Sequence, residues 1–310
     1  MEEKKISIVV PIYNEEANIN ELYRRLEETL SKHFDNLKHE IIFVDDGSSD
    51  KSGELLLMLH GHGKAVKVIQ FSRNFGQHIA IKAGLDYATG DYVAIMDADL
   101  QDDPDTLKKL YEKISEGYDL VLGVREKRKD SFFKKITSRY FFLVMNSMSK
   151  IKMQPNQAMI RIFNSKVLAA LKSMNELHQN NGAFIAWLGF KQATCTVPHN
   201  TRLGGRTKYN FYKSIQFATE AIMSFSNKPL IYISIFGMLV SVISIAYSGY
   251  IIYQRLFNNI GLIGWASTVA LMSFFSGMIL FAIGIVGLYI GKMYQQSLNR
   301  PLYVIKDKFE

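Results

Sequence analysis

The sequence predicts an α/β protein in which a domain with a mostly parallel sheet is followed by a hairpin of two transmembrane helices. Three observations carry this prediction. Short apolar runs alternate with helical stretches over residues 6–124. A polar cluster follows each of the first four apolar runs. Near the end of the chain, two long apolar runs lie between Lys228 and Lys292, where Arg255 is the only charged residue.

Five short runs rich in β-branched residues are the predicted strands. They are Ile6–Val10, Glu40–Val44, Val66–Phe71, Tyr92–Met96 and Leu120–Val124. The predicted helices between them are Asn18–His33, Ser52–His60, Gln77–Ala88 and Pro104–Glu116. Strand–helix alternation at this spacing favours a parallel sheet that is covered by helices.

Polar residues gather at the carboxyl end of each of the first four predicted strands. The clusters are Pro11-Ile12-Tyr13-Asn14-Glu15, Asp45-Asp46-Gly47-Ser48-Ser49-Asp50, Ser72-Arg73-Asn74-Phe75-Gly76 and Asp97-Ala98-Asp99-Leu100-Gln101-Asp102-Asp103. In an open parallel sheet these ends share one edge, and ligands bind there. The four clusters together therefore predict one binding site.

The fourth cluster indicates a metal. Asp97 and Asp99 lie one residue apart at a strand end, so their carboxylates point the same way and repel each other unless a cation lies between them. Mg²⁺ or Mn²⁺, shared with substrate phosphates, meets that need, and Gln101 can add a neutral oxygen. The alternative is a group of helix-capping and loop acids, which we favour for Asp102 and Asp103.

The other clusters carry weaker signals. Asp45 or Asp46 can accept hydrogen bonds from a base or a ribose, although a plain Asx turn explains the same residues. Glu15 can serve a ribose in the same way. Arg73 is expected to clamp a phosphate or an acidic side chain, with a surface ion pair as the alternative.

Composition and charge limit the partners. The chain has 310 residues, of which 48% are hydrophobic, and 37 Lys and Arg face 29 Asp and Glu, for a formal net charge of +8. This balance favours anionic partners such as phosphate-bearing ligands or anionic lipid. Nucleic acid is not expected, because the basic residues accompany predicted membrane-facing helices. The single Cys195 excludes an intramolecular disulfide and a Cys-rich zinc site.

Two basic or amphipathic segments lie between the predicted sheet and the long apolar runs. Over about 131–150, apolar residues at helical spacing alternate with Lys and Arg, which predicts a helix on a membrane surface, with a core-facing helix as the alternative. A second stripe, in 211–228, is expected to lie along the interface too. Between them, Arg202–Tyr209 combines two glycines with Arg202, Arg206 and Lys208. This loop predicts a site for an anionic head group, with a solvated loop as the alternative.

The apolar runs Leu230–Tyr253 and Leu262–Ile290 each exceed the roughly 20 residues that cross a bilayer as a helix. Two buried helices of a soluble core are disfavoured, because two such runs in succession are rare in soluble folds. Basic residues flank the pair on its outer ends, so the positive-inside rule assigns both termini to the cytoplasm. The predicted organisation is a cytoplasmic domain over 1–210, a juxtamembrane helix over 211–228, two membrane helices within 229–292 and a basic tail over 293–310.

The four clusters, in this order and spacing, resemble family 2 glycosyltransferases, and the chain looks most like the polyprenyl-phosphate branch. The resemblance runs from about Ile6 to Lys308. Later segments that share it are Arg202-x-x-Gly205-x-Thr207-Lys208, Ser224-Phe225-Ser226-x-Lys228-Pro229-Leu230, Gly287-x-Tyr289-Ile290-Gly291 and Arg300-Pro301.

The resemblance implies a GT-A fold and a nucleotide-sugar donor, preferably a UDP-sugar. The residues expected to hold this donor are Pro11, Tyr13, Asn14, Glu15, Asp45, Asp46, Ser72, Arg73, Asp97, Ala98 and Asp99. Those expected to hold Mg²⁺ or Mn²⁺ are Asp97, Asp99 and Gln101. Those expected to hold the acceptor phosphate are Arg202, Gly205, Arg206, Thr207 and Lys208. The catalytic candidates are Asp97, Asp99, Arg73 and Asn156.

One departure from the family pattern concerns the general base. Relatives often carry an Asp shortly before the segment that matches Ile160-Arg161-Ile162, whereas this chain reads Gln154-Pro155-Asn156-Gln157-Ala158-Met159. A phosphate monoester has a second pKa of about 6, so at neutral pH most of the acceptor phosphate is fully ionised and is already an anionic nucleophile. Asn156 and Gln157 are then expected to orient it.

The expected activity is transfer of a sugar to undecaprenyl phosphate at the cytoplasmic face of a bacterial inner membrane, for modification of cell-envelope glycans. Inversion at the anomeric carbon is implied by the resemblance, and a homo-oligomer is allowed. The alternatives are a scaffold or accessory protein that keeps the fold, and a processive polysaccharide synthase with another acceptor. The Gln-x-x-Arg-Trp motif of processive relatives is absent from the sequence.

Overall fold

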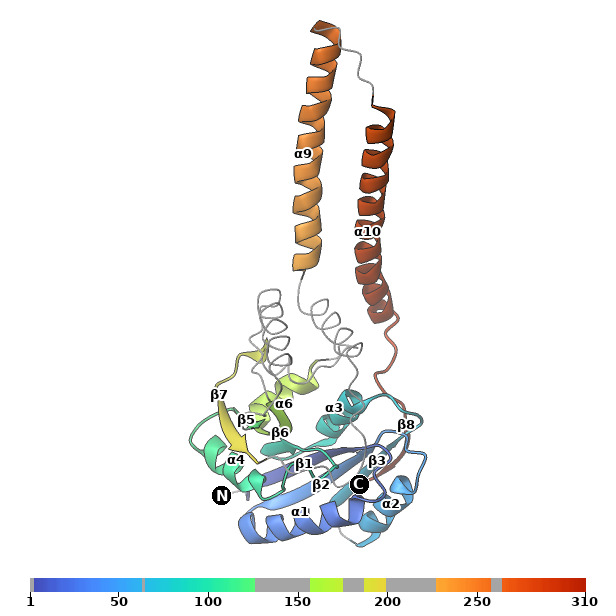
Figure 1. The fold of residues 1–310 in the computed structure, drawn as a ribbon. Coiled ribbons are helices and arrows are strands. Elements are labelled where there is room, and N and C mark those ends of the chain that lie inside the picture. Colours follow the sequence, from blue (N-terminus) through green and yellow to red (C-terminus); the bar gives the residue numbers. More distant parts are fainter. Residues whose placement is uncertain (1–2, 63–64, 126–156, 175–186, 199–226, 258–263) are drawn as a thin grey trace. The chain divides into compact units, whose positions relative to one another are not determined.

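Strands and helices alternate through the first part of the computed structural model, which describes residues 3–62, 65–125, 157–174, 187–198, 227–257 and 264–310 (Figure 1). In chain order the elements are β1 (Lys5–Ile12), α1 (Ile19–His33), β2 (Lys38–Asp45), α2 (Ser52–His62), β3 (Val66–Phe71), α3 (Gln77–Tyr87), β4 (Tyr92–Ile95), α4 (Thr106–Ser115), β5 (Leu120–Arg125), β6 (Gln157–Asn164), α6 (Ser165–Lys172), β7 (Gln192–Val197), α9 (Lys228–Phe257), α10 (Trp265–Ser297) and β8 (Ile305–Phe309). All the predicted strands and helices of residues 6–124 are present, with ends that shift by a few residues.

The strands of the described residues form one mixed sheet in the order β7-β5-β6-β4-β1-β2-β3-β8. β1 pairs in parallel with β2 and β4, and β2 pairs in parallel with β3, so the centre of the sheet is parallel. β6 runs antiparallel between β4 and β5, β7 is parallel to β5, and β8 is antiparallel to β3. The predicted fold class, a mostly parallel α/β sheet followed by two apolar helices, is confirmed. The sequence prediction did not include β6, β7 and β8.

Helices cover both faces of this sheet. Apolar side chains of α1, α2 and α4, among them Leu22, Leu56 and Leu110, share one core with Ile8 of β1. α3 packs on the opposite face. A Cβ atom on its Gly84 would come within 2.3 Å of a methyl carbon of Val9, so glycine lets α3 lie this close to β1. Because β1 faces a core on both sides, it reads as a continuous apolar run.

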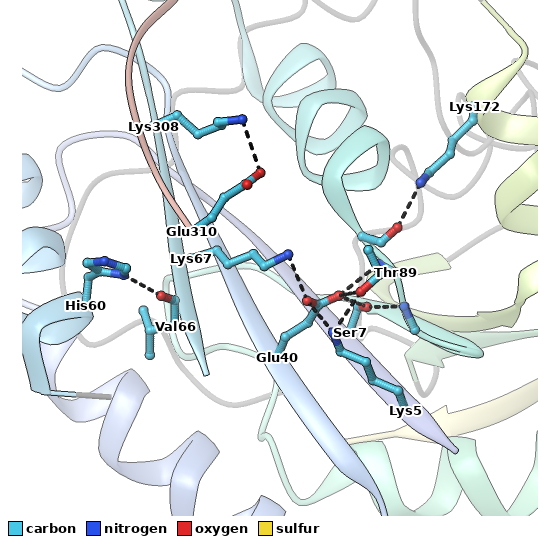
Figure 2. A network of polar contacts seen from close by, with 12 residues as sticks. Lys5, Ser7, Glu40, His60, Val66, Lys67, Thr89, Lys172, Lys308 and Glu310 are labelled. Atoms are coloured by element: carbon cyan, nitrogen blue, oxygen red, sulfur yellow. Dashed lines mark hydrogen bonds and ion pairs between the residues drawn. The ribbon is translucent and has the colours of Figure 1, made fainter. Parts of the chain in front are cut away.

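A buried carboxylate ties together the amino-terminal ends of the central strands (Figure 2). Glu40 of β2 is 2% exposed, and it accepts hydrogen bonds from Lys5 Nζ (2.8 Å), Ser7 Oγ (2.6 Å) and the backbone N–H of Thr89 (2.8 Å). Lys67 Nζ lies 3.1 Å from Glu40 Oε2, the oxygen that also accepts from Lys5. Burial alone would raise the pKa of Glu40, but these partners lower it to about 2. Glu40 is therefore an ionised structural group at the edge opposite the polar clusters.

The described chain divides into two compact units. The first contains the sheet and the helices that cover it, and the second contains α9 and α10. In the second unit, Lys228–Ile251 and Phe274–Ser297 have mean hydropathies of 2.2 and 2.1, and neither segment is buried inside the protein. Both helices are long and apolar enough to cross a membrane. They coincide with the two predicted membrane helices over most of their length.

After α10 the chain returns to the sheet. Residues 301–310 belong to the first unit, and β8 pairs with β3 from Val68 to Phe71. We expected only a basic tail over 293–310. The strand was missed because Lys306, Asp307 and Lys308 interrupt any apolar pattern, and such charged residues are typical of edge strands.

Candidate active site

Four loops follow the central parallel strands at their carboxyl ends: loop 1 (13–18) after β1, loop 2 (46–51) after β2, loop 3 (72–76) after β3 and loop 4 (96–105) after β4. β2 and β4 lie on opposite sides of β1, so the strand order reverses at this point. A crevice outside the carboxyl ends at such a switch point is where ligands bind in open α/β sheets.

Loops 1 and 2 are joined by reciprocal hydrogen bonds. The backbone N–H of Asn14 donates to Ser48 Oγ (3.0 Å), and the N–H of Ser49 donates to Asn14 Oδ1 (2.8 Å). The N–H of Glu15 donates to Ser52 Oγ (2.9 Å). Asn14 has a φ of 54°, a left-handed conformation that asparagine adopts more readily than most residues. The result is a fixed platform beside which Tyr13 stays exposed.

The two aspartates at the end of β2 have different tasks. Asp45 Oδ1 accepts the N–H of Ser48 (2.9 Å), which is the Asx turn considered as an alternative from the sequence. Asp46 instead accepts the N–H groups of Phe75 (2.7 Å) and Gly76 (2.9 Å) from loop 3. Burial raises the pKa of Asp46, while these two donors oppose the shift. Asp46 thus joins loop 2 to loop 3.

Gly47 makes this junction possible. It has a φ of 69°, and a Cβ atom at this position would lie 2.4 Å from the carbonyl carbon of Arg73. Backbone cannot move aside as a flexible side chain can, so loops 2 and 3 approach this closely only with glycine.

Loop 3 presents an exposed cation on an aromatic support. The guanidinium of Arg73 lies 4.2 Å from the centre of the Phe75 ring, within the range of a cation–π contact. Phe75 in turn contacts Phe71 of β3 edge-on, with ring centres 5.6 Å apart. These contacts give Arg73 a defined position at the sheet edge.

Loop 4 holds the predicted metal ligands and is connected to loop 3. Gln77, the first residue of α3, donates from Nε2 to Asp97 Oδ1 (2.6 Å), and the N–H of Gln101 donates to Asp99 Oδ1 (3.1 Å). Burial, followed by the charges of Asp99 and Asp102, raises the pKa of Asp97 to about 7. Hydrogen bonds therefore link loop 1 to loop 2, loop 2 to loop 3, and the start of α3 to loop 4, so the four polar clusters do meet at one edge.

Behind loop 4 lies a charged layer that the sequence prediction missed. Asp102 is buried, and its Oδ1 lies 3.4 Å from Nη2 of Arg125 at the end of β5. Arg161 of β6 is also buried, and burial lowers its pKa to about 10, a shift that the charge of nearby Asp97 opposes. Of the helix-capping and loop roles that we favoured for Asp102, the loop position is confirmed, since it lies in loop 4, but it does not cap α4, which begins at Thr106 with Asp105 as its N-cap. Asp103 does take the loop role, because its Oδ1 accepts the N–H of Asp105 (3.1 Å).

The residues of loop 4 fit a divalent cation that is completed by other ligands. Among the described residues, no group of three or more His, Cys, Asp and Glu side chains is arranged to hold a metal by itself. Two carboxylates one residue apart, with the pKa of Asp97 raised by burial and then by the charges of Asp99 and Asp102, nevertheless form a site where positive charge is favourable. Mg²⁺ commonly binds one or two carboxylates and takes its remaining ligands from phosphates and water.

Several predicted residues lie outside the described part of the chain. They are Asn156, Arg202, Gly205, Arg206, Thr207 and Lys208, together with the amphipathic segment 131–150 and residues 211–226 of the segment 211–228. The roles assigned to them therefore stay predictions. Gln77, Arg125 and Arg161 are additions from the structure. Gln77 starts α3, Arg125 ends β5, and Arg161 lies near Asp97 in space. No signal in the sequence identified these three residues as part of the site.

Comparisons with known proteins place the chain among sugar-transferring enzymes. Residues 7–171 match the family model described as "Glycosyl transferase family 2". An uncharacterized glycosyltransferase of Bacillus subtilis, YkcC, is 39% identical over 98% of this chain and 94% of its own length. The bactoprenol glucosyl transferase of Shigella phage SfX is 33% identical over 98% of this chain and 99% of its own. A crystal structure of Mycobacterium tuberculosis glucosyl-3-phosphoglycerate synthase with Mn²⁺, UDP and phosphoglyceric acid is 18% identical, with a TM-score of 0.49 over 71% of this chain and 76% of its own.

Proposed function

Because the chain belongs to glycosyl transferase family 2, we propose that it transfers a sugar from a nucleotide diphosphate sugar to a polyprenyl phosphate. The observation that carries this proposal is the similarity to bactoprenol glucosyl transferases, which covers 98% of this chain and therefore includes α9 and α10. A lipid-linked acceptor agrees with two apolar helices that follow the catalytic domain. We propose undecaprenyl phosphate as the acceptor and a UDP-sugar as the preferred donor.

In this proposal, the four loops bind the donor. The platform of loops 1 and 2 receives the nucleoside, with Tyr13 and Glu15 beside it. Arg73 faces the diphosphate as a positive charge. Asp97, Asp99 and Gln101 would hold Mg²⁺ or Mn²⁺, which when bound neutralises charge on the diphosphate. Gln77 holds Asp97 in position by the hydrogen bond to its Oδ1.

The acceptor needs little activation. The second pKa of the acceptor phosphate is about 6, so at neutral pH the phosphate is mostly fully ionised and carries no proton that a base must remove. A phosphate oxygen forms a bond to the anomeric carbon while the bond from that carbon to the nucleoside diphosphate oxygen breaks. Attack opposite the leaving group inverts the anomeric centre. The enzyme then contributes positioning and charge stabilisation, and the absence of an Asp near Asn156 does not prevent the reaction.

We also propose that the catalytic domain and both termini face the cytoplasm of a bacterium, with α9 and α10 crossing the inner membrane. The product would supply sugar for modification of envelope glycans on the outer side. The return of the chain to the sheet in β8 supports this topology, because the segments before α9 and after α10 share one sheet and so lie on one side of any membrane.

Transfer of label from a panel of radioactive nucleotide sugars to undecaprenyl phosphate tests the proposal. Purified full-length protein in detergent is supplied with Mg²⁺ or Mn²⁺, and Asp99→Asn is the matched inactive variant. We expect organic-extractable label from one donor, lost in the variant. No labelled lipid from any donor, with protein that still binds nucleotide, would reject the polyprenyl phosphate acceptor.

A further inference from the structure

The segment that follows α10 lies directly against loop 3. The backbone carbonyl of Val304 accepts the N–H of Ser72 (3.0 Å), and the ring of Tyr303 stacks on that of Phe71 with centres 5.1 Å apart and an interplanar angle of 15°. Residues 301–310, here called the C-terminal strap, therefore contact the first residue of the loop that carries Arg73 and the last residue of β3 before it.

From Tyr303, aromatic contacts continue to the guanidinium of Arg73. Phe71 is packed between Tyr303 and Phe75, and Arg73 lies over Phe75. Ring contacts of this kind are directional, because the quadrupole of each ring favours stacked or edge-on arrangements. A shift of the Tyr303 ring therefore changes where Phe75, and with it Arg73, is held.

The orientation of Tyr303 is itself fixed by a polar network. Its hydroxyl donates to Asp86 Oδ2 (3.0 Å), and Asp86 Oδ1 accepts from Lys82 Nζ (2.6 Å). Lys82 is 2% exposed and also donates to the carbonyls of Leu171 and Lys172 at the end of α6.

The rest of the strap contacts the first unit through residues other than Tyr303. β8 pairs with β3, Lys308 lies 4.9 Å from the ring centre of Tyr87, and the rings of Phe309 and His60 are 5.9 Å apart. A change at Tyr303 therefore leaves the strap docked. In sequence, the strap begins four residues after Ser297, the last residue of α10.

We propose that the C-terminal strap positions Arg73 for the diphosphate of the donor, with Tyr303 as the positioning residue. The inference rests on the proposed function, in which Arg73 contacts the donor. It assigns to the segment after the apolar helices a part in donor binding, beyond that of a tail.

A double-mutant cycle in the full-length protein tests this coupling. The dissociation constant of UDP with Mn²⁺ is measured by calorimetry for wild type, Tyr303→Leu, Arg73→Ala and the double variant. We expect Tyr303→Leu to weaken UDP binding by about fivefold to tenfold in the wild type and by less than about twofold in Arg73→Ala, because residues in one contact network are not additive. Tyr303→Phe, which keeps the ring, is expected to restore most of the affinity. Lys306→Ala, an exposed change on β8, is the control.

Equal weakening in both backgrounds, or no weakening in either, would overturn the proposal, because a purely structural role acts independently of Arg73. The same preparations are assayed for label transfer to undecaprenyl phosphate. If the cycle shows the coupling but the wild type transfers no sugar, the proposed acceptor is rejected, whereas the proposed role of the C-terminal strap stands. A wild type that does not bind UDP with Mn²⁺ at all would reject both proposals.

Discussion

Asp46 is a single buried side chain that holds two loops of the site together. Replacing it by Asn leaves one acceptor oxygen for the two part-buried N–H groups of Phe75 and Gly76, so the bond of Gly76 to Oδ2 (2.9 Å) is lost and only its longer bond to Oδ1 (3.2 Å) remains. We expect Asp46→Asn to lower the free energy of unfolding by about 1–3 kcal/mol. Thermal unfolding in detergent measures this loss, and the exposed Asp35→Asn is the control that should change little. Equal stability of the two variants would contradict the role assigned to Asp46.

The acidity of Asp97 makes a pH-dependent prediction for metal-free protein. Its pKa is raised to about 7 from 3.8, so folding favours the protonated form, and this contribution to stability is lost as pH rises from about 4 through 7. The Asn side chain of Asp97→Asn has no proton to lose, so it stays neutral over this range. The melting temperature of the variant relative to wild type should therefore rise as pH increases from 5 to 8 in the presence of EDTA.

Added Mn²⁺ should reverse this order at pH 8, because a ligand that binds only the folded protein stabilises it, and the variant lacks a metal ligand. Asp35→Asn again serves as the control. A difference between Asp97→Asn and wild type that stays constant with pH would show that burial and the acidic neighbours do not raise the pKa of Asp97 as described.

At this scale, the sequence predicted the residues that end strands and little of what supports them. Asp97, Asp99 and Asp46 follow apolar runs directly, so their common edge is readable from the order of elements. Gln77, Arg125 and Arg161 come from three different elements. The proximity of Arg125 and Arg161 to loop 4 depends on the pairing of β6 between β4 and β5. No short-range pattern encodes that pairing.

At the scale of elements, Glu40 is the residue that secures the central strands at the end away from the site. Glu40→Gln should destabilise the protein by about 3 kcal/mol at pH 7, because Lys5 and Lys67 lose their partly buried counter-charge. The folded pKa of Glu40 is lowered to about 2, so this contribution is complete above about pH 4.5 and is lost as pH falls toward 2. Thermal unfolding of Glu40→Gln against exposed Glu54→Gln measures it. A gap between the two that persists unchanged at pH 3 would contradict the ion-pair explanation.

The elements that sequence reasoning found and missed differ in what stabilises them. β1 to β5 are apolar runs bounded by polar turns, and their strand character is local. β8 has the sequence Ile305-Lys306-Asp307-Lys308-Phe309, and it becomes a strand only because the edge of β3 offers it backbone partners. β6 contains the buried Arg161, and a charged residue within a short apolar run is more typical of a surface segment than of a core strand.

For the whole molecule, the place of β8 in the sheet predicts an even number of membrane crossings between β7 and β8. Reporters fused before residue 1 and after residue 310 should therefore lie on the same side, the cytoplasm, and a reporter inserted between residues 258 and 259 should lie outside. Fusions to a phosphatase that is active only outside the cytoplasm distinguish these positions. Activity of the C-terminal fusion would contradict the topology.

The identity of the lipid product tests the central claim most directly. Mass spectrometry of the organic phase, after incubation of the full-length protein with undecaprenyl phosphate, the active nucleotide sugar and Mn²⁺, should reveal undecaprenyl phosphate heavier by one sugar unit. Asp99→Asn should yield only the unmodified lipid. A product that carries a chain of sugars, or sugar on a water-soluble acceptor with the lipid unchanged, would contradict the account and favour a polysaccharide synthase or another acceptor.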